Sequence, residues 1–186
     1  MLEVRWHGRG GQGAKSAAQF LAEAALLSGK HIQAFPEYGP ERAGAPIRAF
    51  TRIDDSAIRI HSSVTNPDIV VVIDPTLISE DILDGLKDDG ILVANTSQSP
   101  EQLRKSLDFK QGKVVTIDAT KVALDTIGVP MPNTPMLGAL LKVKEIVSME
   151  SLKEQIRDKF LKKIGEDKTN ANIEAIKKAY EEAQIG

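Results

Sequence analysis

A glycine-rich segment near the start of the chain has the residue types of an anion-binding loop. Gly8-Arg9-Gly10-Gly11-Gln12-Gly13 matches the pattern G-x-G-x-x-G, and it lies between a predicted strand over residues 2–6 and a predicted helix over residues 14–28. Glycines permit a tight turn, and the first turn of a helix offers unpaired N–H groups and a positive dipole end. Arg9 and Lys15 add positive charge. The segment predicts a phosphate or carboxylate site, although the same glycines would also suit a loop that only packs the helix on the sheet.

Two standard nucleotide motifs do not fit this loop. A Rossmann dinucleotide site needs an acidic residue at the end of the second strand to bind the ribose, but the nearest candidate, Glu37, follows Pro36 inside a loop rich in proline and glycine. A Walker A loop needs lysine directly after its last glycine, whereas Ala14 stands there and Lys15 comes one residue late. The loop therefore predicts anion binding without a standard nucleotide class.

A second segment is dense in turn residues and carries an acid beside a base. Phe35-Pro36-Glu37-Tyr38-Gly39-Pro40-Glu41-Arg42-Ala43-Gly44-Ala45-Pro46 predicts a structured loop. Arg42 would offer a guanidinium to phosphate or carboxylate. In the alternative interpretation, Glu41 and Arg42 pair with each other and brace the loop or a contact between subunits.

Polar residues also follow three predicted apolar strands. Asp74, Asn95 and Asp118 should lie at the carboxyl edge of the sheet, where α/β proteins bind ligands. Each of them also suits the N-cap of the next helix. The histidines have no ligand-like spacing and cysteine is absent, so we assign no metal site and no catalytic residue to this chain.

The elements that position these residues alternate between strands and helices. Runs typical of strands buried on both faces occur at residues 69–73, 91–94 and 114–117. Helical stretches between them predict a three-layer, Rossmann-like α/β fold with a mostly parallel mixed sheet and helices on both faces. Residues 31–35 predict a second strand. Residues 47–53 and 57–61, on either side of Asp54-Asp55, predict a β-hairpin excursion.

The last third of the sequence predicts helices up to the end of the chain. Thr134-Pro135 fits an N-cap followed by proline at the first helical position. Ser151 and Glu154 have the spacing of a capping box, and Gly165 would end that helix. Residues 172–184 predict a final amphipathic helix. With neither repeats nor a low-complexity linker, we expect one domain over residues 1–186.

The composition of the chain argues against several classes of function. A net charge of −2 and scarce aromatic residues argue against a nucleic-acid or membrane partner. The absence of cysteine excludes disulfides, thiol nucleophiles and iron–sulfur clusters on this chain. The N-terminal residues lack the order of a signal peptide, and no apolar run approaches the length of a bilayer span. We expect a cytoplasmic protein.

Together, these features resemble the gamma subunit, or gamma domain, of pyruvate:ferredoxin and related 2-oxoacid:ferredoxin oxidoreductases. That family has G-x-G-G-Q-G after the first strand, then a P-x-x-G-P-E-R-x-G-x-P loop, a hairpin, an apolar strand ending in Asp, and an Asn before a small-residue helix. This sequence supplies both loops, then Asp74, then Asn133 before Met136-Leu137-Gly138-Ala139, in the same order. Ala43 and Ala45 depart from the family pattern, which leaves the fine contacts of the second loop open.

The resemblance implies a role in converting a 2-oxoacid and coenzyme A to an acyl-CoA and carbon dioxide, with electrons passed to ferredoxin. It implies alpha, beta and delta-type subunits as partners, and it implies that thiamine diphosphate and iron–sulfur clusters reside on them. The sequence agrees, because it has no cysteine and no Gly-Asp-Gly thiamine motif with a correctly spaced Asn. Pyruvate is the expected substrate, and 2-oxoisovalerate, 2-oxoglutarate and indolepyruvate are the alternatives.

On this resemblance, the two loops lie at an interface with the thiamine-bearing subunits and shape the approach of coenzyme A or the 2-oxoacid. The candidate ligand-binding or interface residues are Gly8, Arg9, Gly10, Gly11, Gln12, Gly13, Lys15, Glu41, Arg42 and Asn133. Two other classes stay open: a nucleotide- or flavin-binding Rossmann-like enzyme that acts alone, and a scaffold in which the glycine loop only packs the fold.

Overall fold

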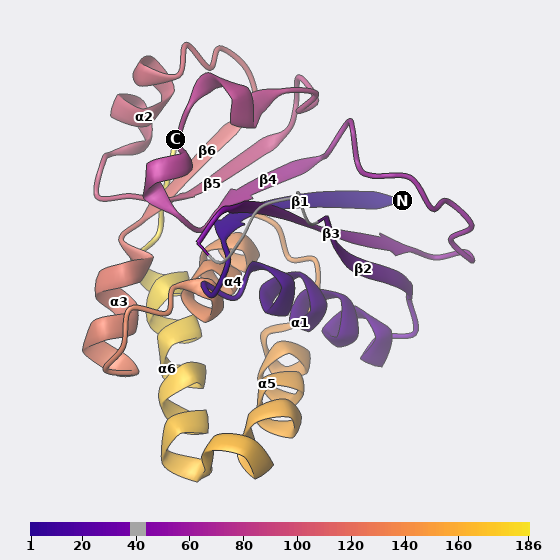
Figure 1. Ribbon diagram of the computed structural model, residues 1–186, viewed down its shortest axis with the longest axis vertical. Coiled ribbons are helices and arrows are strands. Elements are labelled where there is room, and N and C mark those ends of the chain that lie inside the picture. Colours follow the sequence, from indigo (N-terminus) through magenta and orange to yellow (C-terminus); the bar gives the residue numbers. More distant parts are fainter. Residues whose placement is uncertain (38–43) are drawn as a thin grey trace.

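A mixed sheet of seven strands runs through the centre of the protein (Figure 1), whose computed structural model describes residues 1–37 and 44–186. The order of the strands across the sheet is β2-β3-β1-β4-β5-β6-β7. The strands are β1 (Leu2–Arg9), β2 (His31–Glu37), β3 (Pro46–Asp54), β4 (Ile69–Val72), β5 (Ile91–Asn95), β6 (Lys113–Ile117) and β7 (Gln184–Ile185). The central strands β1, β4, β5 and β6 are parallel, whereas β3 and β7 run antiparallel to their neighbours. The predicted mixed, mostly parallel sheet is confirmed.

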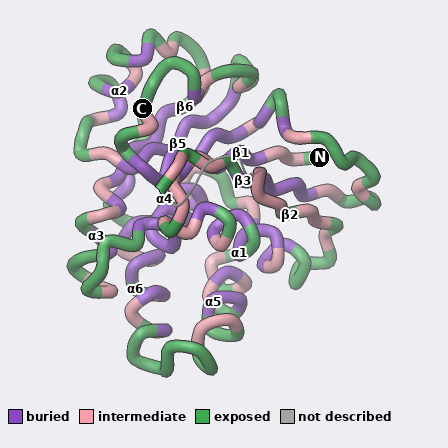
Figure 2. The backbone as a smooth tube through the Cα atoms, in the orientation of Figure 1, coloured by how far each residue is buried: buried purple, intermediate pink, exposed green. Residues whose placement is uncertain are grey.

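Helices lie on both sides of the sheet, and most of them share one side. That side carries α1 (Ala14–Leu27), α3 (Ala119–Thr126), α4 (Asn133–Val143), α5 (Met149–Ile164) and α6 (Glu166–Glu182). The other side carries α2 (Pro100–Ser106) and the 3₁₀ turns η1 (Pro75–Leu77) and η2 (Glu80–Leu83). Figure 2 shows that buried residues follow the central strands and the sides of the helices that face them. The predicted three-layer architecture is also confirmed.

Burial explains the sequences of the strands. β4 and β5 are buried along their whole length, so their residues are almost all apolar and do not alternate with polar ones. In β1 the side chains alternate between the two faces. Val4 and Trp6 belong to the apolar cluster on the α1 side, whereas Arg5 and His7 point to the opposite face.

Arg5 connects β1 to the segment that covers this opposite face. Its side chain is buried, and its Nη2 donates to the carbonyl oxygens of Ile82, at 2.9 Å, and Asp84, at 2.7 Å. Its Nε donates to Nε2 of His7 at 3.0 Å. Because an arginine N–H can only donate, Nε2 of His7 is the acceptor and Nδ1 carries the ring proton. Arg5 therefore fixes both η2 and the tautomer of His7.

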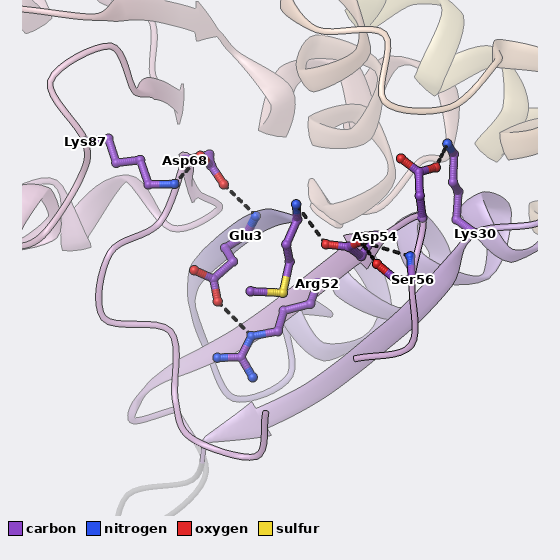
Figure 3. A network of polar contacts seen from close by, with 9 residues as sticks. Glu3, Lys30, Arg52, Asp54, Ser56, Asp68 and Lys87 are labelled. Atoms are coloured by element: carbon purple, nitrogen blue, oxygen red, sulfur yellow. Dashed lines mark hydrogen bonds and ion pairs between the residues drawn. The ribbon is translucent and has the colours of Figure 1, made fainter. Parts of the chain in front are cut away.

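At the other end of β1, charged side chains join the strands to the loops beside them (Figure 3). Arg52 is almost fully buried, and its Nε lies 2.7 Å from the carboxylate of Glu3. Asp68 accepts hydrogen bonds from the backbone N–H of Glu3, at 2.7 Å, and from Nζ of Lys87, at 2.6 Å. These contacts fix the positions of β3 and of the segment before β4 relative to β1.

The hairpin predicted around Asp54-Asp55 is wrong. β3 already pairs with β1 on one edge and with β2 on the other, so the chain after Asp54 has no open edge of β3 to pair with. The carboxylate of Asp54 instead accepts from the backbone N–H of Ser56 in a turn, and residues 57–61 form no strand. The antiparallel hairpin consists of β2 and β3, and β2 runs to Glu37, so Pro36 and Glu37, which were predicted in the loop, pair with β3 instead.

Three predicted helix starts are also wrong. α4 begins at Asn133 and not after Thr134, because the hydroxyl of Thr134 donates to Oδ1 of Asn172 on α6, at 3.0 Å. α5 is capped by Ser148, whose hydroxyl accepts from the backbone N–H of Ser151, so Ser151 is not the cap. α6 begins at Glu166, six residues before the predicted start. The prediction that Gly165 ends α5 is confirmed.

Two connections differ from the predicted pattern. Between β4 and β5 the chain forms only η1 and η2 where a helix was expected. After α6 it forms β7, which pairs antiparallel with β6, whereas helix was predicted to the end. A strand of two residues has too few positions to show a pattern in the sequence.

The partly buried position of His7 leads to a prediction about acid stability. Burial, with added repulsion from Arg5 and Arg48, lowers the pKa of His7 from 6.5 to about 3. Between these values the unfolded chain binds a proton that the native protein does not, so the free energy of unfolding falls as the pH falls. Relative to His7→Gln, which keeps an acceptor for Arg5, the wild type should lose about 1 kcal/mol per pH unit between pH 6 and pH 4. Urea unfolding at several pH values measures both slopes, and equal slopes would contradict the burial of a neutral His7.

Candidate functional site

The glycine loop is a tight turn held by the side chain of Gln12. Oε1 of Gln12 accepts from the backbone N–H of Arg9 at 2.8 Å, and the backbone N–H of Gln12 donates to the carbonyl oxygen of Arg9 at 3.1 Å. Gly11 and Gly13 have φ angles of +96° and +79°, in the left-handed region that favours glycine. The loop therefore needs glycine at these two positions for its backbone shape.

Gly8 has a different role, at the end of β1. A Cβ atom there would lie 3.1 Å from Cβ of Ala14 and 3.7 Å from Cβ of Ile73. The absence of a side chain lets the first turn of α1 pack closely on β1 and on the end of β4. This contact agrees with the packing interpretation of the motif for Gly8, whereas Gly11 points away from the rest of the described protein.

The start of α1 has no side-chain cap within the part of the chain that the structure describes. Its N-cap is Gly13, and its first turn contains no acidic residue. The first N–H groups of a helix have no partner within the helix, and they carry the positive end of the dipole. Lys15 lies exposed in this first turn. In general, a helix N-terminus of this kind can bind a phosphate or a carboxylate.

Arg9, which was predicted to add charge for a ligand, braces the loop. Its Nε and Nη2 lie 3.2 and 3.1 Å from the hydroxyl of Thr76, and its Nη1 donates to the carbonyl oxygen of Gly44 at 3.2 Å. Its Nε also lies 3.6 Å from the carboxylate of Asp74. Arg9 thus joins the glycine loop to the turn after β4 and to the residue at which the second loop returns to the described chain.

Asp74 is the buried anchor of this arrangement. Burial alone would raise its pKa, but hydrogen bonds from Thr76 and Gln12 and the charge of Arg9 outweigh burial and lower the pKa below its usual value. Its Oδ1 accepts from the hydroxyl of Thr76 at 2.6 Å, and its Oδ2 accepts from Nε2 of Gln12. Asp74 therefore stays ionised at neutral pH. It also caps η1, as its position after a strand predicted.

Asn133 lies against the glycine loop, although 120 residues separate it from Gly13. A Cβ atom on Gly13 would lie 2.5 Å from Nδ2 of Asn133 and 2.8 Å from its Cγ. Asn133 is 5% exposed, and its Oδ1 is buried with no hydrogen-bond partner among the described residues. A buried amide without a partner is unusual and calls for a physical reason. The structure thus brings Asn133 to the start of α1.

The remaining candidates are placed elsewhere or not described. Asn95 donates from Nδ2 to the carbonyl oxygen of Ile73, at 2.8 Å, and to the hydroxyl of Thr120, at 2.9 Å. Asp118 caps α3. Glu41 and Arg42 lie outside the described residues. Thr76 was missed, and the sequence signal that could have found it is the turn-forming Asp-Pro-Thr directly after a strand.

The parts of the chain that the structure describes contain no cluster of three histidine or acidic residues suited to a metal ion. Across those same residues, no helix combines the length and the apolar composition needed to span a bilayer.

Comparisons with known proteins identify relatives over nearly the whole chain. The family model described as pyruvate ferredoxin/flavodoxin oxidoreductase matches residues 3–182. The pyruvate synthase subunit PorC of Thermotoga maritima is 54% identical over 183 residues, which cover 98% of this chain and 95% of the relative. The common gamma subunit of the pyruvate/ketoisovalerate oxidoreductases of Pyrococcus furiosus is 48% identical over 186 residues, which cover 100% of this chain and 98% of the relative.

Solved structures agree with these relatives. The crystal structure of the pyruvate oxidoreductase subunit PORC from Thermotoga maritima superposes with a TM-score of 0.89 at 50% identity, and the match covers 100% of this chain and 98% of that one. A 2-oxoglutarate:ferredoxin oxidoreductase from Magnetococcus marinus gives a TM-score of 0.76 at 24% identity, and the match covers 96% of this chain and 30% of that one. At that identity the second match shows the fold alone.

The contact between Gly13 and Asn133 can be tested with a matched pair of substitutions. Gly11→Ala and Gly13→Ala both place alanine at a positive φ, which costs about 1 kcal/mol. Only Gly13→Ala also forces a methyl group into Asn133, so it should lower the free energy of unfolding by about 1–3 kcal/mol more. Denaturant unfolding measures both. Asn133→Ala should relieve part of the extra cost in the double mutant, and equal costs for the two single mutants would rule out the contact.

Proposed function

The chain belongs to the pyruvate ferredoxin/flavodoxin oxidoreductase family, and we propose that it is the gamma subunit of a pyruvate:ferredoxin oxidoreductase. In this role it supports the oxidative decarboxylation of a 2-oxoacid to an acyl-CoA and carbon dioxide, with electrons passed to ferredoxin. The family match over residues 3–182 carries this proposal. We take residues 1–186 as one gamma-type domain that acts within a complex containing alpha, beta and delta-type subunits.

The redox groups of such a complex belong on the other subunits. Iron–sulfur clusters are held by cysteine thiolates, and this chain has no cysteine, so its residues do not fit a cluster. It also lacks the Gly-Asp-Gly motif of a thiamine diphosphate site. The contribution of this chain is therefore to bind and orient a substrate and to complete an interface.

The uncapped start of α1 suits a phosphate of coenzyme A. Its free N–H groups and its dipole favour a dianion, the exposed Lys15 supplies a cation, and the first turn holds no carboxylate that would repel one. Asn133 places an amide beside Gly13, where it limits how deeply a ligand can enter. Arg42 and Glu41 belong to the second loop, which Arg9 joins to the same edge through Gly44, and we propose that they complete the site with residues of a neighbouring subunit.

A second candidate substrate is supported by the names of the relatives. The gamma subunits of Pyrococcus furiosus and Thermococcus litoralis, each 48% identical to this chain, are named as common to pyruvate and ketoisovalerate oxidoreductases. A gamma subunit that serves two oxidoreductases does not choose between their 2-oxoacids. We therefore propose that substrate choice lies on the thiamine-bearing subunit, and that 2-oxoisovalerate is the alternative to pyruvate.

Purification from native cells tests the assembly. An affinity tag on this chain should recover larger subunits together with thiamine diphosphate and iron, and the preparation should oxidise pyruvate only when coenzyme A is present. Assays with 2-oxoisovalerate and 2-oxoglutarate compare the alternatives. Recovery of the chain alone, without thiamine or iron, would overturn the proposed function.

Substitution of Lys15 tests the coenzyme A site in the assembled enzyme. Lys15→Ala removes one charge-assisted contact with a phosphate, which should raise the KM for coenzyme A about fivefold. Because the bond-breaking steps take place on other subunits, kcat and the KM for pyruvate should stay unchanged. Lys162→Ala, at the exposed end of α5, is the control. An unchanged KM for coenzyme A in the Lys15 variant would remove the start of α1 from the site.

A further inference from the structure

A separate cavity lies on the sheet face opposite α1. Its volume is about 720 Å³, within the range of roughly 300–1,000 Å³ that is typical of small-molecule sites. The lining includes His7, Glu37, Arg48, Leu77, Ser79 and Ile82. These residues come from β1, β2, β3 and the segment that contains η1 and η2. Nothing in the proposed function uses this cavity.

Its floor is a row of three polar side chains that crosses three adjacent strands. His7 on β1 lies directly opposite Arg48 on β3, and Arg48 lies directly opposite Glu37 on β2. Side chains paired in this way on an antiparallel sheet stand on the same face and about 5 Å apart. The row therefore places an imidazole, a guanidinium and a carboxylate side by side.

The imidazole is prepared to donate a hydrogen bond. Nε2 of His7 accepts from Nε of Arg5, so the proton is on Nδ1. Burial and the positive charges of Arg5 and Arg48 keep the ring neutral at neutral pH. Arg5 is itself buried and held by two carbonyl oxygens, which fixes the ring in place. His7 is thus a neutral donor of fixed orientation.

The guanidinium of Arg48 is held from one side. Its Nη2 lies 2.6 Å from Oε2 of Glu37, and Oε1 of Glu37 accepts from the hydroxyl of Ser63 at 2.7 Å. A guanidinium has five N–H donors, so this ion pair orients Arg48 and leaves donors for a ligand. About half of the Arg48 side chain is exposed, which keeps those donors accessible.

The walls of the cavity supply apolar surface, and their carboxylates limit the negative charge that a ligand can carry. Leu77 and Ile82 line the cavity, and Ile82 is held in place because Arg5 binds its carbonyl oxygen. Asp81 and Asp84 also belong to the lining, so a ligand with several negative charges would be repelled. The cavity favours one anionic group on a short carbon chain.

We propose that this cavity is a second binding site, which takes a small organic monocarboxylate. The carboxylate binds the guanidinium of Arg48 and the Nδ1–H of His7, and the carbon chain packs against Leu77 and Ile82. The site is independent of the start of α1, which lies on the other side of the sheet and suits a phosphate. Failure of either proposal therefore leaves the other intact.

Nuclear magnetic resonance of the full chain with ¹⁵N-labelled histidine tests the proposal. Acetate and pyruvate at millimolar concentrations should shift the ring signals of His7 with saturation, and acetamide, which is neutral and similar in size, should not. His31 and His61 lie outside the cavity, and their signals should stay in place. No saturable shift with either acid, or equal shifts with acetamide, would overturn the site.

Two substitutions test the residues without removing His7. Arg48→Gln should weaken the binding of acetate at least about tenfold, because it removes a charged donor. Leu77→Trp should abolish binding by filling the cavity. Arg59→Gln, an exposed arginine outside the lining, is the matched control and should bind like the wild type. Circular dichroism verifies the fold of each variant. Unchanged acetate binding in a folded Arg48 or Leu77 variant would contradict the proposal.

Discussion

The buried, ionised carboxylate of Asp74 organises the carboxyl edge of the sheet. It receives hydrogen bonds from Thr76 on its own turn and from Gln12 of the glycine loop, and Arg9 lies beside it. A charge in such a place is tolerated only when donors surround it. The same contacts hold Gln12 and Arg9 in place, and therefore the glycine loop between β1 and α1. In this way they help to orient the first N–H groups of α1. The chemistry of the loop thus depends on an aspartate that a ligand need not touch.

Features that depend on residues close together in the sequence were predicted, whereas contacts between residues far apart in the sequence were missed. The glycine loop and the end of α5 at Gly165 follow from backbone conformations that glycine favours, so a single sequence is enough to find them. The role of Arg9 as a brace depends on Thr76, 67 residues away, and no spacing rule reveals that pair. The predicted hairpin failed for a related reason, since the local turn signal at Asp54-Asp55 is real but says nothing about which edges of β3 are occupied. Asn133 became a candidate only through a family resemblance, and its contact with Gly13 was not predicted, because the spacing of the residues does not show it.

The two faces of the sheet offer different chemistry because the side chains of β1 and β3 alternate. On the α1 side they form an apolar cluster with the helices. The proposed anion site on this side therefore lies at the edge of the sheet, at the start of α1. On the opposite side Arg5, Arg48 and Arg52 stand on neighbouring strands, and the segment that contains η1 and η2 lies beside them, held by hydrogen bonds from Arg5 to Ile82 and Asp84. The two sites that we propose, one for phosphate and one for carboxylate, therefore share no residue.

The outer edge of β2 pairs with no other strand among the described residues. β2 is the outermost strand on its side of the sheet. An edge strand exposes backbone N–H and C=O groups with which a strand of another chain can pair. Pro36 lies in this edge strand, and its nitrogen carries no hydrogen to donate to another strand. At this one position, therefore, β2 has no N–H to offer to any neighbouring strand.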